Sequence, residues 1–373
     1  MEKLLLEGCC EILDSMRVPI TSSDRVEGPY PYYGANGIQD YVADYIFDDE
    51  LVLLAEDGGN FGSKERPIAY RVSGKCWVNN HAHVLKPKEG LDVDYLCYSL
   101  MFYNVGGMVN GATRQKLTQA AMRQMLIPKR AMEEQKYIVD LLAKVVAVKE
   151  KRQQELTELD NLIKARFVEL FGDTVINPKG WREHRLDEYI TFLTSGSRGW
   201  AQYFTDEENE LFITIKNVKN NHITLDDIQY VDAPENKEAE RTKVKTGDLL
   251  ISITADLGRT GVVDDSIADR GAYINQHLSL VRLEQDKINP LYVSYFLETS
   301  GGKRQFESKN QNGVKAGLNF EAIKSLKILV PPIEMQKQYI DFVEQVDKSK
   351  VAVQKALDET KQLFDSLMQQ YFG

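Results

Sequence analysis

The feature that most constrains this chain is a gapless internal repeat near its middle and its end. Residues 127–172 align with residues 328–373, and identical residues match from Glu133 and Glu334 to Gly172 and Gly373. Residues 133–171 and 334–372 contain no glycine or proline, which predicts two long, uninterrupted helices. Because an internal repeat organises the whole fold, we expect the order domain, helix, domain, helix.

Both predicted helices carry a mostly apolar seam with the alternating four-and-three spacing of a coiled coil. The first seam consists of Ile138, Leu142, Val145, Lys149, Arg152, Leu156, Leu159, Ile163, Arg166 and Leu170. The second seam consists of Tyr339, Val343, Val346, Lys350, Val353, Leu357, Thr360, Phe364, Leu367 and Tyr371. The lysine in the middle of each seam favours one register over slipped ones. We therefore expect an antiparallel helix pair with one domain at each end.

The segments before the helices carry short apolar runs and turn signals, such as Asn36-Gly37, which are typical of mixed α/β domains with many strands. They also resemble each other, since residues 77–81 are similar to residues 273–277 and both end in histidine, His81 and His277. The predicted fold class is α+β with a pseudo-twofold internal repeat. The expected domains are residues 1–130 and 173–332, and the expected helices are residues 131–172 and 333–373.

Charge is unevenly distributed along the chain. The net charge is −10, which by itself argues against binding to nucleic acid. Residues 95–132 nevertheless contain no acidic residue, while five basic residues lie among them, namely Arg114, Lys116, Arg123, Lys129 and Arg130. A basic stretch in an acidic chain predicts a local nucleic-acid contact.

Six basic residues are candidates for contact with DNA, through a phosphate or a guanine edge. Arg114 and Lys116 lie in the acid-free stretch, and Lys315 has the matching position in the second domain. Lys303, Arg304 and Lys309 form a weaker group, since Glu307 interrupts them. The alternative interpretation is ordinary surface charge.

Other chemistry is less well supported. Cys76, His81 and His83 could suggest a metal site, but four ligands with recognisable spacing are missing, so we expect no metal. Asp57 and Asp256 precede or nearly precede glycine after a predicted strand, and we interpret them as turn residues. We find neither an Asn-Pro-Pro-Tyr motif nor a Gly-x-x-x-x-Gly-Lys loop, and expect no catalytic or cofactor-binding residue.

The chain also has features of a cytoplasmic protein. Its four cysteines lie in the first third of the sequence, which is a poor disulfide framework and predicts reduced thiols. No apolar run approaches the roughly 18 to 20 residues that span a bilayer. The N-terminus contains only a three-leucine run, so we do not expect a signal peptide.

Several motifs together resemble one family. Ile-Pro-x-x-x-Met-Glu-Glu-Gln at residues 127–135 and Val-Pro-Pro-Ile-Glu-Met-Gln at residues 330–336 look like the motif that opens the helices of type I restriction–modification specificity subunits. Gly-Ala-Thr-Arg-Gln-Lys-Leu at residues 111–117 looks like the end of their target-recognition domains, and residues 32–38, 77–84, 245–250 and 275–277 are also similar. Trp181 to Leu186 resembles the usual opening of such a domain. The first domain lacks this opening, so we expect an absent edge strand or a trimmed start there.

The resemblance implies a non-catalytic subunit that reads a bipartite, asymmetric double-stranded DNA site, one half with each target-recognition domain. It also implies that the helices space the two domains and dock two methyltransferase subunits, with two restriction subunits completing the complex. S-adenosylmethionine, ATP and Mg are then expected on the partners and none of them on this chain. Two alternatives remain: a self-sufficient methyltransferase or nuclease with fused recognition domains, and a coiled-coil scaffold for protein interactions.

Overall fold

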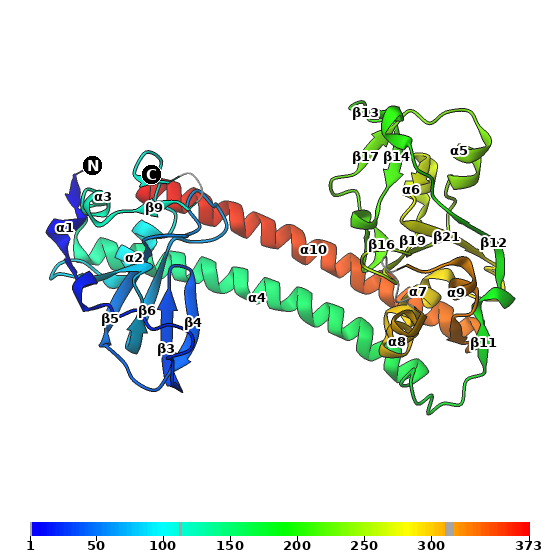
Figure 1. Ribbon diagram of the computed structural model, residues 1–373, viewed down its shortest axis with the longest axis horizontal. Helices are drawn as coiled ribbons and strands as arrows, with labels where there is room; N and C mark the ends of the chain where they lie inside the picture. The colour runs from blue at the N-terminus through cyan, green and yellow to red at the C-terminus, as the bar shows by residue number, and fades with distance from the viewer. Residues whose placement is uncertain (1, 112–113, 310–316) are drawn as a thin grey trace. The chain divides into compact units, whose positions relative to one another are not determined.

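The structure, a computed structural model, describes residues 2–111, 114–309 and 317–373 (Figure 1). It divides into two compact units. Unit 1 comprises Met1–Glu155 and Val353–Gly373, and unit 2 comprises Leu156–Ala352. The divisions fall inside the two long helices, α4 (Met132–Phe171) and α10 (Ile333–Phe372), so each unit contains part of each helix.

Unit 1 is built on a six-stranded sheet with the order β2-β7-β5-β6-β3-β4. The strands are β2 (Cys10–Ile12), β3 (Glu27–Gly34), β4 (Gly37–Val42), β5 (Phe47–Ala55), β6 (Ala69–Val78) and β7 (Ala82–Pro87). All neighbouring pairs are antiparallel except β3 with β6. Two short ribbons complete the strands: β1 (Lys3–Leu5) with β10 (Leu126–Pro128), and β8 (Val109–Asn110) with β9 (Lys116–Leu117).

The core of unit 1 lies between this sheet and the long helices. Leu54 of β5, Leu96 of α2 (Val93–Met101) and Leu142 of α4 are fully buried in one cluster, which Phe364 of α10 joins. The helix α2 is therefore covered by the sheet on one side and by the long helices on the other. Three short helices complete the unit: α1 (Leu6–Cys9), η1 (Asp14–Met16) and α3 (Gln119–Arg123).

Unit 2 has a six-stranded sheet with the order β12-β21-β18-β19-β16-β15 and a four-stranded sheet with the order β13-β17-β14-β20. The first sheet comprises β12 (Ile190–Ser195), β15 (Val218–Lys219), β16 (Asn221–Ile223), β18 (Leu249–Ser252), β19 (Thr260–Val262) and β21 (Leu278–Leu283). The second comprises β13 (Phe204–Thr205), β14 (Glu210–Ile213), β17 (Gln229–Val231) and β20 (Ala272–Ile274). A separate ribbon pairs β11 (Glu183–Arg185) with β22 (Lys327–Leu329).

The core of unit 2 repeats the layering of unit 1. Leu249 of β18, Tyr292 of α7 (Pro290–Glu298) and Val343 of α10 are buried in one cluster with Phe167 of α4. The remaining helices are α5 (Lys237–Thr242), α6 (Asp265–Asp269), α8 (Ser300–Lys309), α9 (Phe320–Lys324) and the short turns η2 (Leu186–Glu188), η3 (Trp200–Tyr203) and η4 (Ile215–Asn217). The predicted fold class, mixed sheet and helix regions with two long helices, is confirmed.

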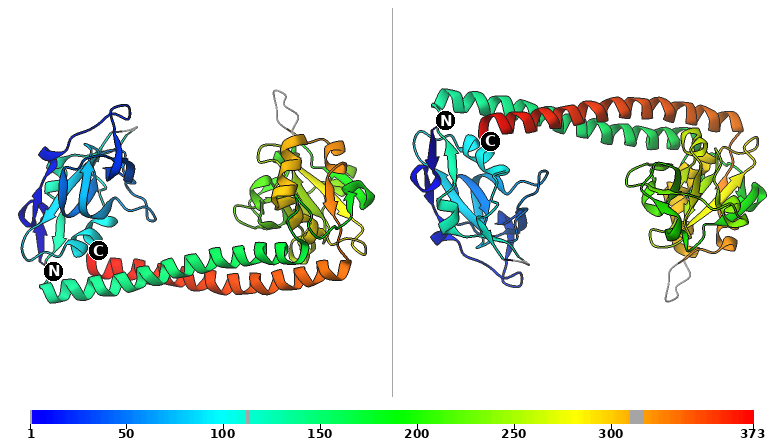
Figure 2. Two further views of the ribbon diagram at one scale, coloured as in Figure 1. Left: turned by 90° about the horizontal axis from the view of Figure 1, so that it is seen from below. Right: turned by 90° about the horizontal axis from the view of Figure 1, so that it is seen from above.

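Within each unit α4 and α10 lie side by side (Figure 2), and their contacts show that they are antiparallel. In unit 1, Lys149 lies over the ring of Phe364, and Arg152 donates to the Ala356 carbonyl. In unit 2, the Lys350 ammonium lies 2.7 Å from the Asp160 carboxylate. Of the two predicted seam lysines, Lys149 thus contacts an aromatic ring and Lys350 forms an ion pair with an acid.

The predicted seam is buried at Ile138, Leu142, Val145 and Ile163 of α4, is exposed at Lys149, and is wrong at the C-terminal end of the helix. Phe167 and Phe171 are buried there, at 3% and 1% exposure, whereas the predicted seam residues Arg166 and Leu170 are only half-buried. The reason is that an α-helix of about 3.6 residues per turn drifts away from a 3.5-residue repeat. Here the drift turns the two phenylalanines towards Tyr292 and Tyr339.

The glutamine of the repeated motif fastens each domain to its long helix. Gln135 Oε1 accepts from the Asp92 amide at 2.8 Å, and Gln336 Oε1 accepts from the Asn289 amide at 2.9 Å. Asp92 and Asn289 are the N-caps of α2 and α7. Both glutamines are buried, so the repeat in the sequence corresponds to a repeated polar clamp.

The expectation that the first domain lacks an edge strand is wrong. β1 pairs with β10 in the same way as β11 pairs with β22. One further backbone hydrogen bond extends each pair: the Leu6 amide donates to the Met125 carbonyl, and the Leu186 amide donates to the Leu326 carbonyl. This strand pairs through backbone groups alone, so it does not require the tryptophan that opens the second domain. In the described part of the chain, no helix combines the length and apolarity needed to cross a membrane.

Candidate nucleic-acid interface

One edge of the unit 1 sheet gathers the segments that the sequence singled out. The Glu56 amide, just after β5, donates to the His81 carbonyl at 2.9 Å in the turn between β6 and β7. The Leu117 amide donates to the Glu56 carbonyl at 2.7 Å, and the Gly58 amide donates to the Gln115 carbonyl at 3.1 Å. These bonds place Arg114 and Lys116 beside the end of β5. We call Asp57, Gly58, His81, Arg114 and Lys116 the loop edge.

Arg114 is exposed but anchored. Its side chain is 60% exposed, and its Nη2 lies 2.8 Å from Asp57 Oδ1. The same carboxylate oxygen is 2.6 Å from His81 Nδ1. A guanidinium that is held through one nitrogen while the side chain stays exposed is suited to contact with a ligand.

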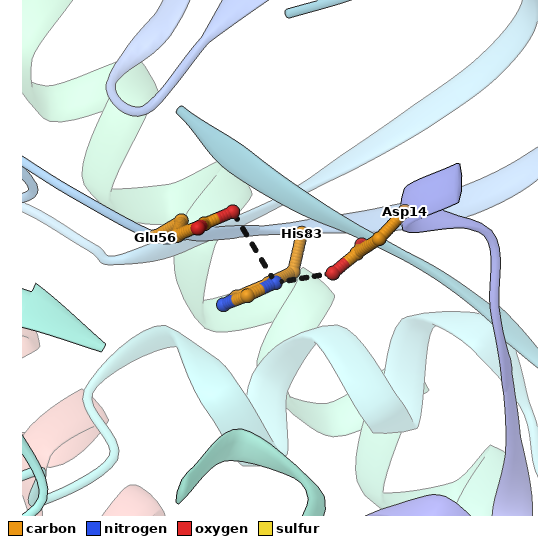
Figure 3. Close-up of side chains that lie close together, drawn as sticks. All are labelled: Asp14, Glu56 and His83. Carbon is orange, nitrogen blue, oxygen red and sulfur yellow. Dashed lines mark hydrogen bonds and ion pairs between the residues drawn. The ribbon is translucent and has the colours of Figure 1, made fainter. Parts of the chain in front are cut away.

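Lys116 is anchored to a buried ionic network, of which Figure 3 draws Asp14, Glu56 and His83. Its ammonium lies 2.9 Å from Glu56 Oε1, while Glu56 Oε2 accepts from Arg17 at 2.6 Å. Figure 3 shows the His83 ring between Asp14 and Glu56, with Nδ1 2.6 Å from Asp14 Oδ2 and 3.7 Å from Glu56 Oε2. His83 Nε2 lies 2.9 Å from the Leu117 carbonyl, so the network also supports the segment that carries Lys116.

Both acids of this network are stabilised in their charged form. Burial opposes the ionisation of Asp14, but the hydrogen bond and charge of His83 outweigh it and lower the pKa of the carboxyl. Burial likewise opposes the ionisation of Glu56, and hydrogen bonds from Arg17 and Lys116 lower its pKa. The cost of burying the charges of Asp14 and Glu56 is therefore offset by hydrogen bonds and by nearby positive charge.

Among the described residues, Asp14, Glu56 and His83 form the only group of acidic, histidine and cysteine side chains close enough to share a metal ion. Their polar atoms already contact Arg17, Lys116, Gln119 and backbone groups. We therefore assign the group a structural role. Cys76 lies in a different place, the apolar cluster of β5, β6 and β7, where burial raises the pKa of its thiol to about 12.

Unit 2 repeats the backbone pattern of the loop edge. The Ile253 amide donates to the His277 carbonyl at 3.0 Å, and the Leu318 amide donates to the Ile253 carbonyl at 2.9 Å. His277 Nδ1 lies 2.7 Å from Thr254 Oγ1, as His81 lies against Asp57. Thr254 and His277 thus correspond to Asp57 and His81.

The other predicted contact residues are distributed differently. Lys315, whose sequence position matches Arg114, lies outside the described residues. On α8, Lys303 lies 3.2 Å from Glu298, and Lys309 donates to Ser325 at 2.8 Å. The charge of Arg304 contributes to a lowered pKa of Asp173, and the main causes of that shift are backbone hydrogen bonds from Val175 and Ile176. Lys303 and Lys309 of α8 therefore contact two different neighbours, Glu298 and Ser325.

The basic stretch of the sequence is not an unpaired positive surface. In space its cations meet acids from outside the stretch: Arg114 with Asp57, Lys116 with Glu56, Arg123 with Glu7, Lys129 with Glu2, and Arg130 with the nearby Glu134. Asp57, which the sequence predicted only as a turn residue, is thereby a partner of both Arg114 and His81. Asp256, predicted in the same way, pairs with Arg259. The duplicated histidine, His81 and His277, was the available signal for this site.

Comparison with known proteins identifies the family. The model described as the type I restriction modification DNA specificity domain matches residues 1–158 and again residues 178–360. A putative type I restriction enzyme specificity subunit of Haemophilus influenzae is 27% identical over 362 residues, covering 92% of this chain and 86% of the relative. The EcoKI specificity subunit of Escherichia coli is 22% identical over 351 residues, covering 87% of this chain and 74% of the relative.

A solved structure shares the fold. The type I restriction-modification S subunit of M. genitalium has a TM-score of 0.61 at 13% identity, covering 100% of this chain and 96% of that chain. The resemblance seen in the sequence motifs is confirmed, because the family model covers both domains and most of the helices. This chain belongs to the type I restriction modification DNA specificity domain family and is a type I specificity subunit.

Proposed function

We propose that the loop edge of unit 1 and the matching segments of unit 2 each contact one half of a bipartite DNA site. The observation that carries this proposal is the repeat of one hydrogen-bond pattern in both units, with histidine at the same place in each. The side chains on this common backbone pattern differ between the units: unit 1 has Asp57 where unit 2 has Thr254. Two similar but diverged surfaces in one chain are suited to an asymmetric site, whereas a homodimer would read a symmetric one.

We further propose that this chain is non-catalytic and that its partners carry the chemistry. Support comes from the sequence, which has no amino-methyltransferase motif and no phosphate-binding loop. Two methyltransferase subunits would supply S-adenosylmethionine, and two restriction subunits would use ATP and Mg. The long helices would dock the methyltransferases. The four described cysteines are all free and buried, which is consistent with the reducing cytoplasm as the site of action.

Charge supports a division of labour between this chain and its partners. The net charge is −10, and the cations of the loop edge are paired with acids. Phosphate neutralisation supplies most non-specific DNA affinity, so we expect the isolated chain to bind DNA weakly and to aggregate through its uncovered partner surface. The methyltransferases would contribute the positive charge, and this chain the base contacts. Nanomolar, specific binding by the isolated chain would contradict this division.

The test is modified-base sequencing of the host genome with and without the gene. We expect deletion to abolish methyl-adenine in one bipartite motif, two short blocks separated by unread base pairs. Unchanged methylation, with this chain and its methyltransferase demonstrably expressed, would reject the proposed function. Methylation or cleavage of DNA by this chain alone would favour a self-sufficient enzyme. If DNA binding by the assembled complex does not depend on salt, a protein-binding scaffold becomes the better interpretation.

A further inference from the structure

We propose that Asp57 and His81 are positioning residues that hold the Arg114 guanidinium for a guanine in the half-site read by unit 1. This inference rests on the proposed function of the loop edge. It names guanine as the base that Arg114 contacts, and Asp57 and His81 as the neighbours that make this contact selective.

The carboxylate of Asp57 connects the sheet to the arginine. Asp57 Oδ1 lies 2.6 Å from His81 Nδ1 and 2.8 Å from Arg114 Nη2, and Arg114 Nη2 is also 3.4 Å from His81 Nδ1. The Asp57 side chain is only 18% exposed, against 60% for Arg114. His81 is itself fixed, because its amide donates to Asn79 Oδ1 at 2.8 Å.

Gly58 provides the surface over which the guanidinium lies. A Cβ atom at this position would lie 3.3 Å from Arg114 Nε and 3.5 Å from Nη2, so a side chain there would shift the guanidinium slightly from its place. Gly58 is held from both sides, since its amide donates to the Gln115 carbonyl and its carbonyl accepts from Asn36 Nδ2 at 3.0 Å. The arginine is therefore restrained by a charge, an imidazole and a backbone surface.

Restraint at one nitrogen favours base recognition over phosphate binding. Within the described parts of the chain, the polar contacts of the Arg114 guanidinium, a hydrogen bond to Asp57 and an approach to His81, all lie on Nη2. Nη2 carries two hydrogens, and the one that does not face Asp57 forms with Nη1 or Nε a donor fork that matches guanine N7 and O6. A guanidinium already paired with a carboxylate gains less from the negative charge of a phosphate, while its fixed plane costs less entropy on forming two directed bonds.

Among the described residues of unit 2, two positions of this arrangement differ, although the backbone hydrogen bonds are the same. Thr254 replaces Asp57, and Ala255 replaces Gly58 with nearly the same backbone angle, φ 54° against 63°. The Cβ that would disturb Arg114 is therefore present in unit 2. Changes to this arrangement should alter one half-site and leave the other as an internal reference.

The experiment expresses the chain with its cognate methyltransferase and reads the methylated motif by modified-base sequencing. Arg114→Ala, Arg114→Lys, Asp57→Asn and Gly58→Ala are compared with wild type. The control is Asp49→Asn, at the other end of β5, where the carboxylate lies 2.7 Å from Lys86 in an ordinary surface ion pair. Ala255 shows that alanine adopts the backbone angle of Gly58 without preventing folding.

We expect Arg114→Ala to lower the preference for guanine at one position of one block by about 5- to 150-fold, the range of a bidentate arginine contact. Arg114→Lys should lose that preference too, because an ammonium cannot make the planar double contact. Asp57→Asn and Gly58→Ala should lower it partially at the same position. The other block and Asp49→Asn should keep the wild-type pattern.

Each contrary result has a separate meaning. If Arg114→Ala relaxes one position but Asp57→Asn and Gly58→Ala match wild type, the positioning roles are wrong and the proposed function stands. If Arg114→Lys matches wild type, or if Arg114→Ala weakens every site equally, the arginine contacts phosphate and the inference is overturned. If Asp57→Asn lowers methylation through both blocks alike, its role is structural. If the wild-type complex methylates no bipartite motif, the proposed function itself fails.

Discussion

The repeated glutamine clamp gives a quantitative prediction with an internal comparison. Gln135 makes three hydrogen bonds: it accepts from the Asp92 amide at 2.8 Å and donates to the Gly90 and Arg130 carbonyls at 2.9 Å each. Its counterpart Gln336 makes two, accepting from Asn289 at 2.9 Å and donating to Pro331 at 2.8 Å. Replacement of either glutamine by leucine keeps the approximate volume and removes these bonds.

The expected cost follows from the number of bonds. A buried hydrogen bond contributes about 0.5–1.5 kcal/mol net, so Gln135→Leu should destabilise unit 1 by about 1.5–4.5 kcal/mol and Gln336→Leu should destabilise unit 2 by about 1–3 kcal/mol. Gln338→Leu, at an exposed site on α10, is the control and should change stability by less than about 0.5 kcal/mol.

Hydrogen exchange with mass spectrometry can assign the effect to one unit. At about 1.4 kcal/mol per tenfold change, exchange in α2 should accelerate about 10- to 2,000-fold in Gln135→Leu and remain unchanged in α7. Gln336→Leu should accelerate α7 about 5- to 150-fold and leave α2 unchanged. The reasoning is refuted if both variants loosen α2 and α7 equally, or if neither differs from Gln338→Leu.

Three further predictions concern stability. The pKa values of Asp14 and Glu56 are lowered in the folded chain, so the contribution of these carboxylates to the free energy of unfolding is present above their ordinary pKa values of 3.8 and 4.5. This contribution is lost as the pH falls through the folded pKa values. Urea unfolding should therefore show that acid destabilises the chain, and that the loss of stability is smaller in Asp14→Asn. Leu142→Ala, at a fully buried site, should cost about 2–5 kcal/mol, whereas Leu162→Ala, at 47% exposure, should cost much less; equal shifts in denaturation midpoint would contradict the observed core. Tyr292→Phe removes a buried hydroxyl that donates to the Leu329 carbonyl at 2.8 Å and should cost about 1 kcal/mol, which would be checked by thermal unfolding against the exposed substitution Tyr41→Phe.

The long helices could be predicted because their signal is local and periodic. An absence of glycine and proline together with a four-and-three apolar spacing determines a helix and its buried face, and both copies show this. The short strand β1 was missed because its pairing with β10 uses backbone groups, which any sequence provides. The end of the α4 seam was misplaced because the heptad pattern is an approximation to the helix period.

The loop edge was only partly predictable, for a reason of sequence distance. Arg114 and Lys116 stood out as cations in a stretch without acids, but their partners Asp57 and Glu56 lie at the end of β5, far back in the sequence. The sheet brings these segments together through hydrogen bonds of Glu56 with His81 and Leu117. A charge pattern along a chain therefore predicts a surface charge only when no other strand supplies the counter-ion.

The loop edge of unit 1 and the matching segments of unit 2 together suggest how one fold can serve two different half-sites. The bonds that repeat in both edges join backbone groups, as Glu56 with His81 and Ile253 with His277, so different side chains can accompany them. Buried positions could therefore change from His83 of unit 1, which lies 2.6 Å from Asp14, to Ser279 of unit 2, whose hydroxyl donates to the Thr194 carbonyl. Exposed positions could change from Asp57 to Thr254 on the same backbone. Because a duplicated chain needs each copy to diverge without refolding, a backbone-defined edge is the part of this molecule where new DNA specificity can arise at the lowest cost in stability.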